Sequence, residues 1–131
     1  MGTNYLSIPG MRRGASAVTQ YRGVVLDTTA YRVLPITNAN AERPLGILQD
    51  DPAATNEPCD VAYMGVVRAE YGGTIAIGDR LAFNNNGQLI ADAEVSGGGT
   101  DLHHVADALE AGASGEIHWT LLHTPVLIGT E

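Results

Sequence analysis

The sequence contains no lysine, and arginine is the only strongly basic residue among its 131 positions. Seven arginines stand against fifteen aspartates and glutamates, which gives a formal net charge of −8 at pH 7. General nucleic-acid binding depends on a basic surface that displaces counterions from phosphates. The acidic balance therefore argues against a nucleic-acid-binding function.

Cysteine and long apolar runs are equally scarce. Cys59 is the only cysteine, so no intrachain disulfide can support the fold. Its neighbours Pro58 and Asp60 provide no cation to activate the thiol. No apolar run approaches the roughly 18–20 residues that cross a bilayer, and the N-terminus lacks the apolar core of a signal peptide. We expect a soluble protein made in a cytoplasm, without membrane contact.

Glycine and proline, by contrast, are well represented. Sixteen glycines and six prolines divide the chain into short segments, as is typical of all-β proteins. Aromatic residues make up only 5% of the chain, so the core must be built from Val, Ile, Leu and Ala. The length fits one domain. We predict an all-β domain over residues 15–131, preceded by an extended arm over residues 1–14.

The clearest local signal is a hairpin within residues 72–93. Asn86 and Gly87 both tolerate the positive φ of a tight turn. Leu81 and Phe83 share one face of the first arm, and the residues after the turn alternate in the same way. A second tight turn is predicted at Gly78.

Four further strands are predicted before this hairpin, at residues 21–26, 30–36, 44–49 and 59–69. We also predict a close backbone approach at Gly46 and a bulge at Gly65. Residues 103–112 are compatible with a helix ended by Gly112. They are equally compatible with a strand that pairs, across a turn at 113–115, with residues 116–122. Because Ile117, Trp119 and Leu121 share one face of the second segment, we favour the hairpin.

The arm shows no sustained periodicity, and Pro9-Gly10 interrupts it. We predict that Tyr5, Leu6 and Ile8 are apolar anchors that need a partner surface. Such an arm can add a strand to the edge of a sheet; a disordered terminus is the alternative.

Basic residues are concentrated near the start of the chain. Four arginines, Arg12 and Arg13 among them, precede residue 34 against the single Asp27. This segment would dock on an acidic surface, either within its own oligomer or on a partner. A solvated basic tail is the alternative interpretation.

No motif indicates catalysis, and we predict no catalytic residue, no cofactor and no enzymatic activity. Four histidines raise the question of a metal site: His103, His104, His118 and His123. The first two are adjacent, so they point to opposite faces of a strand. His104 and His123 fall roughly opposite each other if the last hairpin forms. Zinc needs three or four ligands, and no cysteine or organised carboxylate completes the set. We therefore predict no metal site.

From about Val18 onward, the order of these signals resembles the trimeric head-decoration (capsid cement) proteins of tailed bacteriophages. The resemblance covers most of the chain and rests on five segments: Tyr-Arg-Gly-Val-Val-Leu at 21–26, residues 43–53 with Pro-Leu-Gly-Ile-Leu, residues 61–65, Ile-Ala-Ile-Gly-Asp-Arg-Leu at 75–81, and residues 105–113 with Ala-Leu-Glu-Ala.

The resemblance implies a small β-barrel-like (β-tulip-type) fold without catalysis. It also implies a homotrimer on the capsid exterior at three-fold or quasi-three-fold positions, where it binds the major capsid protein and cements neighbouring capsomers against the pressure of packaged DNA. Such a protein is made in the host cytoplasm and resides in the virion.

The resemblance does not cover residues 1–14. A capsid contact by Tyr5, Leu6, Ile8, Arg12 and Arg13 is therefore a hypothesis from the residues themselves. The alternative function is a small β-barrel ligand- or carbohydrate-binding module on the virion surface.

Overall fold

A computed structural model describes residues 5–38, 42–91 and 102–129. Within these ranges the chain is all-β, as predicted, and no helix long and apolar enough to cross a membrane occurs. The described strands are β1 (Tyr5–Ser7), β2 (Arg12–Arg13), β3 (Gly23–Leu26), β4 (Arg32–Pro35), β5 (Gly46–Leu48), β6 (Val61–Glu70), β7 (Arg80–Phe83), β8 (Leu89–Ala91), β9 (Leu102–Ala108) and β10 (Ile117–Gly129).

All ten strands belong to one sheet with the order β2-β4-β3-β5-β6-β10-β9-β7-β8, and β1 pairs with β6 beside this path. Over the described residues, β2 and β8 stand at opposite ends of this order and do not pair with each other. The sheet is therefore open, whereas the expected architecture was barrel-like.

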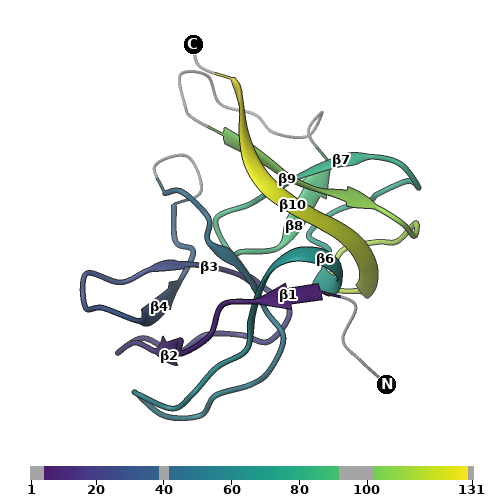
Figure 1. The fold of residues 1–131 in the computed structure, drawn as a ribbon. Coiled ribbons are helices and arrows are strands. Elements are labelled where there is room, and N and C mark those ends of the chain that lie inside the picture. The colour runs from purple at the N-terminus through teal and green to yellow at the C-terminus, as the bar shows by residue number, and fades with distance from the viewer. Residues whose placement is uncertain (1–4, 39–41, 92–101, 130–131) are drawn as a thin grey trace.

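The ten-residue strand β6 joins the two halves of the sheet. Its first part pairs with β5 and β1, and its second part pairs with β10. In Figure 1, β2, β3 and β4 lie on one side of β6, and β7 to β10 lie on the other. The predicted bulge is present near Gly65, whose φ is +116°, because Tyr63 is skipped in the register with β1.

The central hairpin has the predicted geometry. Gly87 has φ +77°, and the side-chain oxygen of Asn84 accepts hydrogen bonds from the backbone N–H groups of Asn86 (2.9 Å) and Gln88 (3.0 Å). The Gly87 carbonyl also accepts a hydrogen bond of 2.8 Å from the N–H of Gly23 on β3. The turn therefore connects the two halves of the sheet as well as reversing the chain.

Two apolar clusters form the core. The larger extends from β3 and β5 across β6 to β10 and contains the fully buried Tyr71. The smaller gathers residues of the first half: Met11, Val18, Val24, Val33, Leu48 and Val61. Met11, which is 4% exposed, places part of the N-terminal segment inside the core.

Residues 102–108 form a strand, so the hairpin interpretation of the last segment is confirmed and the helix is excluded there. Ile117, Trp119 and Leu121 do share one face. Over residues 117–123, the part of β10 whose burial is described, the buried residues are Thr120 and Leu122 on the other face. The more apolar face of this strand is thus turned outward.

Candidate functional site

The N-terminal segment lies against the chain's own sheet. β1 runs antiparallel to β6 with Leu6 opposite Met64, and the Ile8 N–H donates to the Val61 carbonyl at 3.0 Å. The Tyr5 hydroxyl donates a hydrogen bond to the carboxylate of Asp60. Residues 5–8 thus pair along one edge with a strand of the same chain.

Arg12 and Arg13 also bind within the chain. The Arg12 guanidinium donates to the carbonyl of Asn56 at 2.8 Å, and that of Arg13 donates to the carbonyls of Ala53 (2.6 Å) and Ser16 (3.2 Å). Ala53 and Asn56 lie within residues 50–58, which carry three carboxylates, but the two arginines bind backbone carbonyls of this segment. Docking of the basic segment on another subunit or on a partner stays a prediction.

An exposed apolar surface crosses the centre of the sheet, where β1, β6 and β10 lie side by side (Figure 1). Cross-strand pairing places Leu6 beside Met64 and Val66 beside Leu121. Because residues two apart on a strand share a face, both pairs lie on the same side of the sheet. The apolar residues on this outward face are here called the apolar strip: Leu6, Met64, Val66, Ile117, Trp119 and Leu121.

Four members of the strip are well exposed: Leu6 (54%), Met64 (39%), Ile117 (46%) and Leu121 (41%). Single exposed apolar side chains are ordinary, but contiguous ones mark interaction surfaces. Trp119 is held in place by the Arg68 guanidinium, whose carbon lies 4.8 Å from the ring centroid. The strip can bind a partner by burial of apolar area, and it offers no group for catalysis.

Of the residues predicted to contact a partner, the structure brings Leu6 into the strip. Tyr5 and Ile8 are half-buried against the two core clusters, and Arg12 and Arg13 lie at the acidic loop. Sequence reasoning missed the strip's other members because their outward facing depends on the non-local pairing of β6 with β1 and β10. The visible signal was the alternation of Ile117, Trp119 and Leu121.

The surroundings of Cys59 and His118 indicate a structural role for both side chains. Burial raises the pKa of the Cys59 thiol to about 11, and nearby carboxylates add to the effect, so the thiol stays protonated at neutral pH. The His118 ring lies between Glu116 and Glu110, at 3.0 Å and 2.9 Å, and these hydrogen bonds raise its pKa. Neither group lines the two cavities found among the described residues.

His104 and His123 lie together, as the hairpin predicted, with their Nε2 atoms 3.3 Å apart. Asp107 approaches the same point, with its Oδ1 3.1 Å from His104 Nε2. This carboxylate is a third potential ligand, which the sequence did not reveal. Residues three apart on a regular strand point to opposite faces, so the spacing of His104 and Asp107 gave no signal. The side chain of His103 lies outside the described residues.

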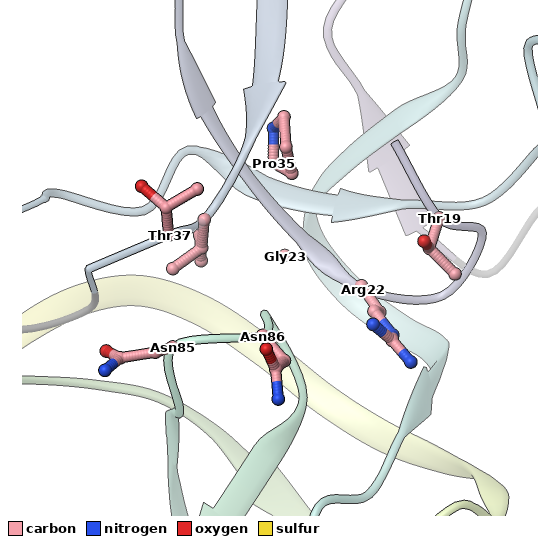
Figure 2. Close-up of a pocket in the computed structure, with 8 residues that line it drawn as sticks. Thr19, Arg22, Gly23, Pro35, Thr37, Asn85 and Asn86 are labelled. Atoms are coloured by element: carbon pink, nitrogen blue, oxygen red, sulfur yellow. The ribbon is translucent and has the colours of Figure 1, made fainter. Parts of the chain in front are cut away.

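A cavity of about 350 Å³ opens between the two halves of the sheet (Figure 2). Its labelled lining is mainly polar and includes Thr19, Arg22, Thr37, Asn85 and Asn86. Arg22 makes an ion pair of 3.1 Å with Glu70. Pro35 and Ile36 add apolar area to the lining, and none of the lining residues is aromatic.

Comparison with known proteins supports a capsid role. A family model described as phage cement protein matches residues 10–120. No curated protein matches the sequence. Among solved structures, the chain is similar to the head fiber gp8.5 N base of bacteriophage phi29, with 16% sequence identity and a TM-score of 0.62. The superposition covers 95% of this chain and 98% of the head fiber chain. At that identity the likeness shows a shared fold. The family match, which spans most of the domain, shows that the chain belongs to the phage cement proteins, structural proteins of the phage capsid.

Proposed function

We propose that this protein binds the outside of the phage capsid as a homotrimer at three-fold or quasi-three-fold positions and cements neighbouring capsomers. The major capsid protein is its partner, and the bound trimer stabilises the shell against the pressure of packaged DNA. The family match over residues 10–120 supports the capsid role. The observation that carries the mode of binding is the exposed apolar strip on β1, β6 and β10.

The strip is the surface that we assign to the major capsid protein. It contains Leu6, one of the contact residues expected from the sequence, with 54% of its surface exposed. The other four residues then act indirectly, because Tyr5 and Ile8 anchor β1 to the core while Arg12 and Arg13 fasten the following segment to the acidic loop. The N-terminal segment positions the contact, and Leu6 forms part of it.

The energy available at the strip is sufficient for a reversible contact. Complete burial of a large apolar side chain contributes about 1.5–3 kcal/mol. The four well-exposed side chains are close to half-exposed, so each can add about 1 kcal/mol when covered. About 4 kcal/mol per copy is weak alone, but three linked copies that bind neighbouring capsomers gain by avidity.

Binding to expanded, undecorated capsids tests this proposal. The variant Leu6→Ser/Leu121→Ser removes two strip side chains that contribute little to the core. It should co-sediment with capsids at least about 30-fold more weakly than the original chain, because about 2 kcal/mol of contact energy is lost per copy. Light scattering should show the same trimer mass for both proteins.

The matched control is Leu26→Ser on β3, which removes an equally exposed leucine (59%) outside the strip. It should bind capsids like the original chain. Equal binding by the double variant would refute the strip as the capsid contact. A double variant that becomes monomeric would also refute it, since the strip would then be the subunit interface.

A further inference from the structure

Three potential metal ligands from two neighbouring strands converge in the middle of the β9–β10 hairpin. His104 and Asp107 belong to β9, and His123 belongs to β10. The His104 Nε2 atom lies 3.3 Å from His123 Nε2 and 3.1 Å from Asp107 Oδ1, and His123 Nε2 lies 4.0 Å from Asp107 Oδ2. Among the described residues, this is the group whose ligand atoms all lie within 4.8 Å of one another.

These separations match those around a tetrahedral zinc ion. Zinc–nitrogen and zinc–oxygen bonds of about 2.0–2.2 Å at tetrahedral angles place neighbouring ligand atoms about 3.4 Å apart. Two imidazoles and one carboxylate form a donor set that zinc accepts, with the fourth position left for water or another oxygen. Only the 4.0 Å separation between Asp107 Oδ2 and His123 Nε2 has to shorten for an ion to fit.

An irregularity in β10 places His123 at this point. Leu122 pairs with Ala106, but the next pair joins Val126 to His104, so residues 123–125 of β10 face a single residue of β9. Bulges of this kind redirect a side chain and are frequent at functional sites. His123 is thereby turned toward its neighbours on β9.

The three side chains of the cluster are buried to different degrees. The His104 side chain is 12% exposed, whereas those of His123 and Asp107 are 28% and 38% exposed. One side of the cluster therefore stays open to solvent, which gives an ion both a path of entry and a place for a water ligand. The net charge of −8 also favours the approach of a cation.

His104 Nε2 also lies 2.9 Å from the carbonyl oxygen of Ala106. When that nitrogen carries a proton, it donates to Ala106 and Asp107. When it is deprotonated, the nitrogen is available to a metal, and the carbonyl becomes a nearby oxygen donor. A hydrogen-bonded group without metal is thus the competing arrangement, and an experiment can separate the two.

We propose that His104, Asp107 and His123 bind one zinc ion per chain and that the ion links β9 to β10. Asp107 is the cross-strand partner of Leu121, so the ion would lie directly beside the apolar strip. Its role is structural, because it fixes the two strands where their register shifts. This site is independent of capsid binding, and either proposal can fail without the other.

The test uses the untagged full-length protein, treated with a chelator and then titrated with zinc chloride by calorimetry. One equivalent should bind, and a 100-fold excess over the dissociation constant should raise the melting temperature by about 5–10 °C. His104→Asn and His123→Asn should each weaken zinc binding by more than about tenfold, because even second-shell partners of metals cost about 10–100-fold.

His118→Asn is the matched control. Its two ring nitrogens face separate carboxylates, Glu110 and Glu116, on different sides of the ring, so it should bind zinc like the original chain. Melting without zinc checks that every variant folds. Absence of stoichiometric binding by the folded original chain would overturn the proposal. Binding that is equally strong in His104→Asn and His123→Asn would overturn it as well.

Discussion

Gly46 is the position where a single methyl group should do the greatest damage to this fold. It lies on β5 against β6, and a Cβ atom there would stand 2.1 Å from the backbone oxygen of Ala62 and 3.1 Å from its carbonyl carbon. Ordinary contacts begin near 3.5 Å. Since backbone blocks the space, Gly46→Ala must push β5 away from β6 by about 1 Å or more.

The cost follows from what this shift disrupts. Ile47 and Leu48, the two residues that pair with β6, are both fully buried in the core clusters. Overpacking alone costs about 1–3 kcal/mol, and loss of strand pairing adds to it. We expect Gly46→Ala to lower the free energy of unfolding by about 3 kcal/mol or more, and the melting temperature by about 10 °C.

Urea unfolding measures this effect, with Gly78→Ala as the comparison. Gly78 has φ +87° and open space around its Cα, so alanine there suffers only backbone strain of about 1–2 kcal/mol. Gly46 does not lie in the left-handed region, and its cost is purely steric. If Gly46→Ala were no more destabilising than Gly78→Ala, the described contact between β5 and β6 would be wrong.

Two further predictions concern the end of the β9–β10 hairpin. Tyr71→Phe should lower the free energy of unfolding by about 1 kcal/mol in urea, because the buried hydroxyl donates a 2.7 Å hydrogen bond to the Glu110 carbonyl; an unchanged midpoint would contradict that bond. His118 has a raised pKa owing to Glu116 and Glu110, so its stabilising effect is complete below the ordinary histidine value of about 6.5 and disappears as pH rises through the raised value. The original chain should lose stability over that interval relative to His118→Asn, and parallel pH profiles would contradict this account.

Local turn chemistry made much of the fold predictable. Asn86 and Gly87 specify their turn through backbone preference, and Gly46 indicated a close approach that the structure contains. The final hairpin was also predictable, since its strands are joined by a short turn and alternate with period two. In each case the determining residues are neighbours in sequence.

Non-local pairing was not predictable. The N-terminal segment reads as an unattached arm because its partners, such as Asn56 for Arg12, lie 44 residues away. The sequence also did not show which face of β10 is buried. Thr120 is buried, and its hydroxyl donates a hydrogen bond of 3.3 Å to the Val67 carbonyl, while Leu121 is turned outward. A sequence shows that a strand has two faces, but contacts with β6 decide which one is buried.

Electron cryomicroscopy of decorated capsids would show whether this protein cements the capsid from outside through its apolar strip. We expect three copies around each occupied three-fold or quasi-three-fold position on the outer surface, with β1, β6 and β10 against the major capsid protein. Density inside the shell, single copies at other positions, or a trimer whose strip faces solvent would contradict it.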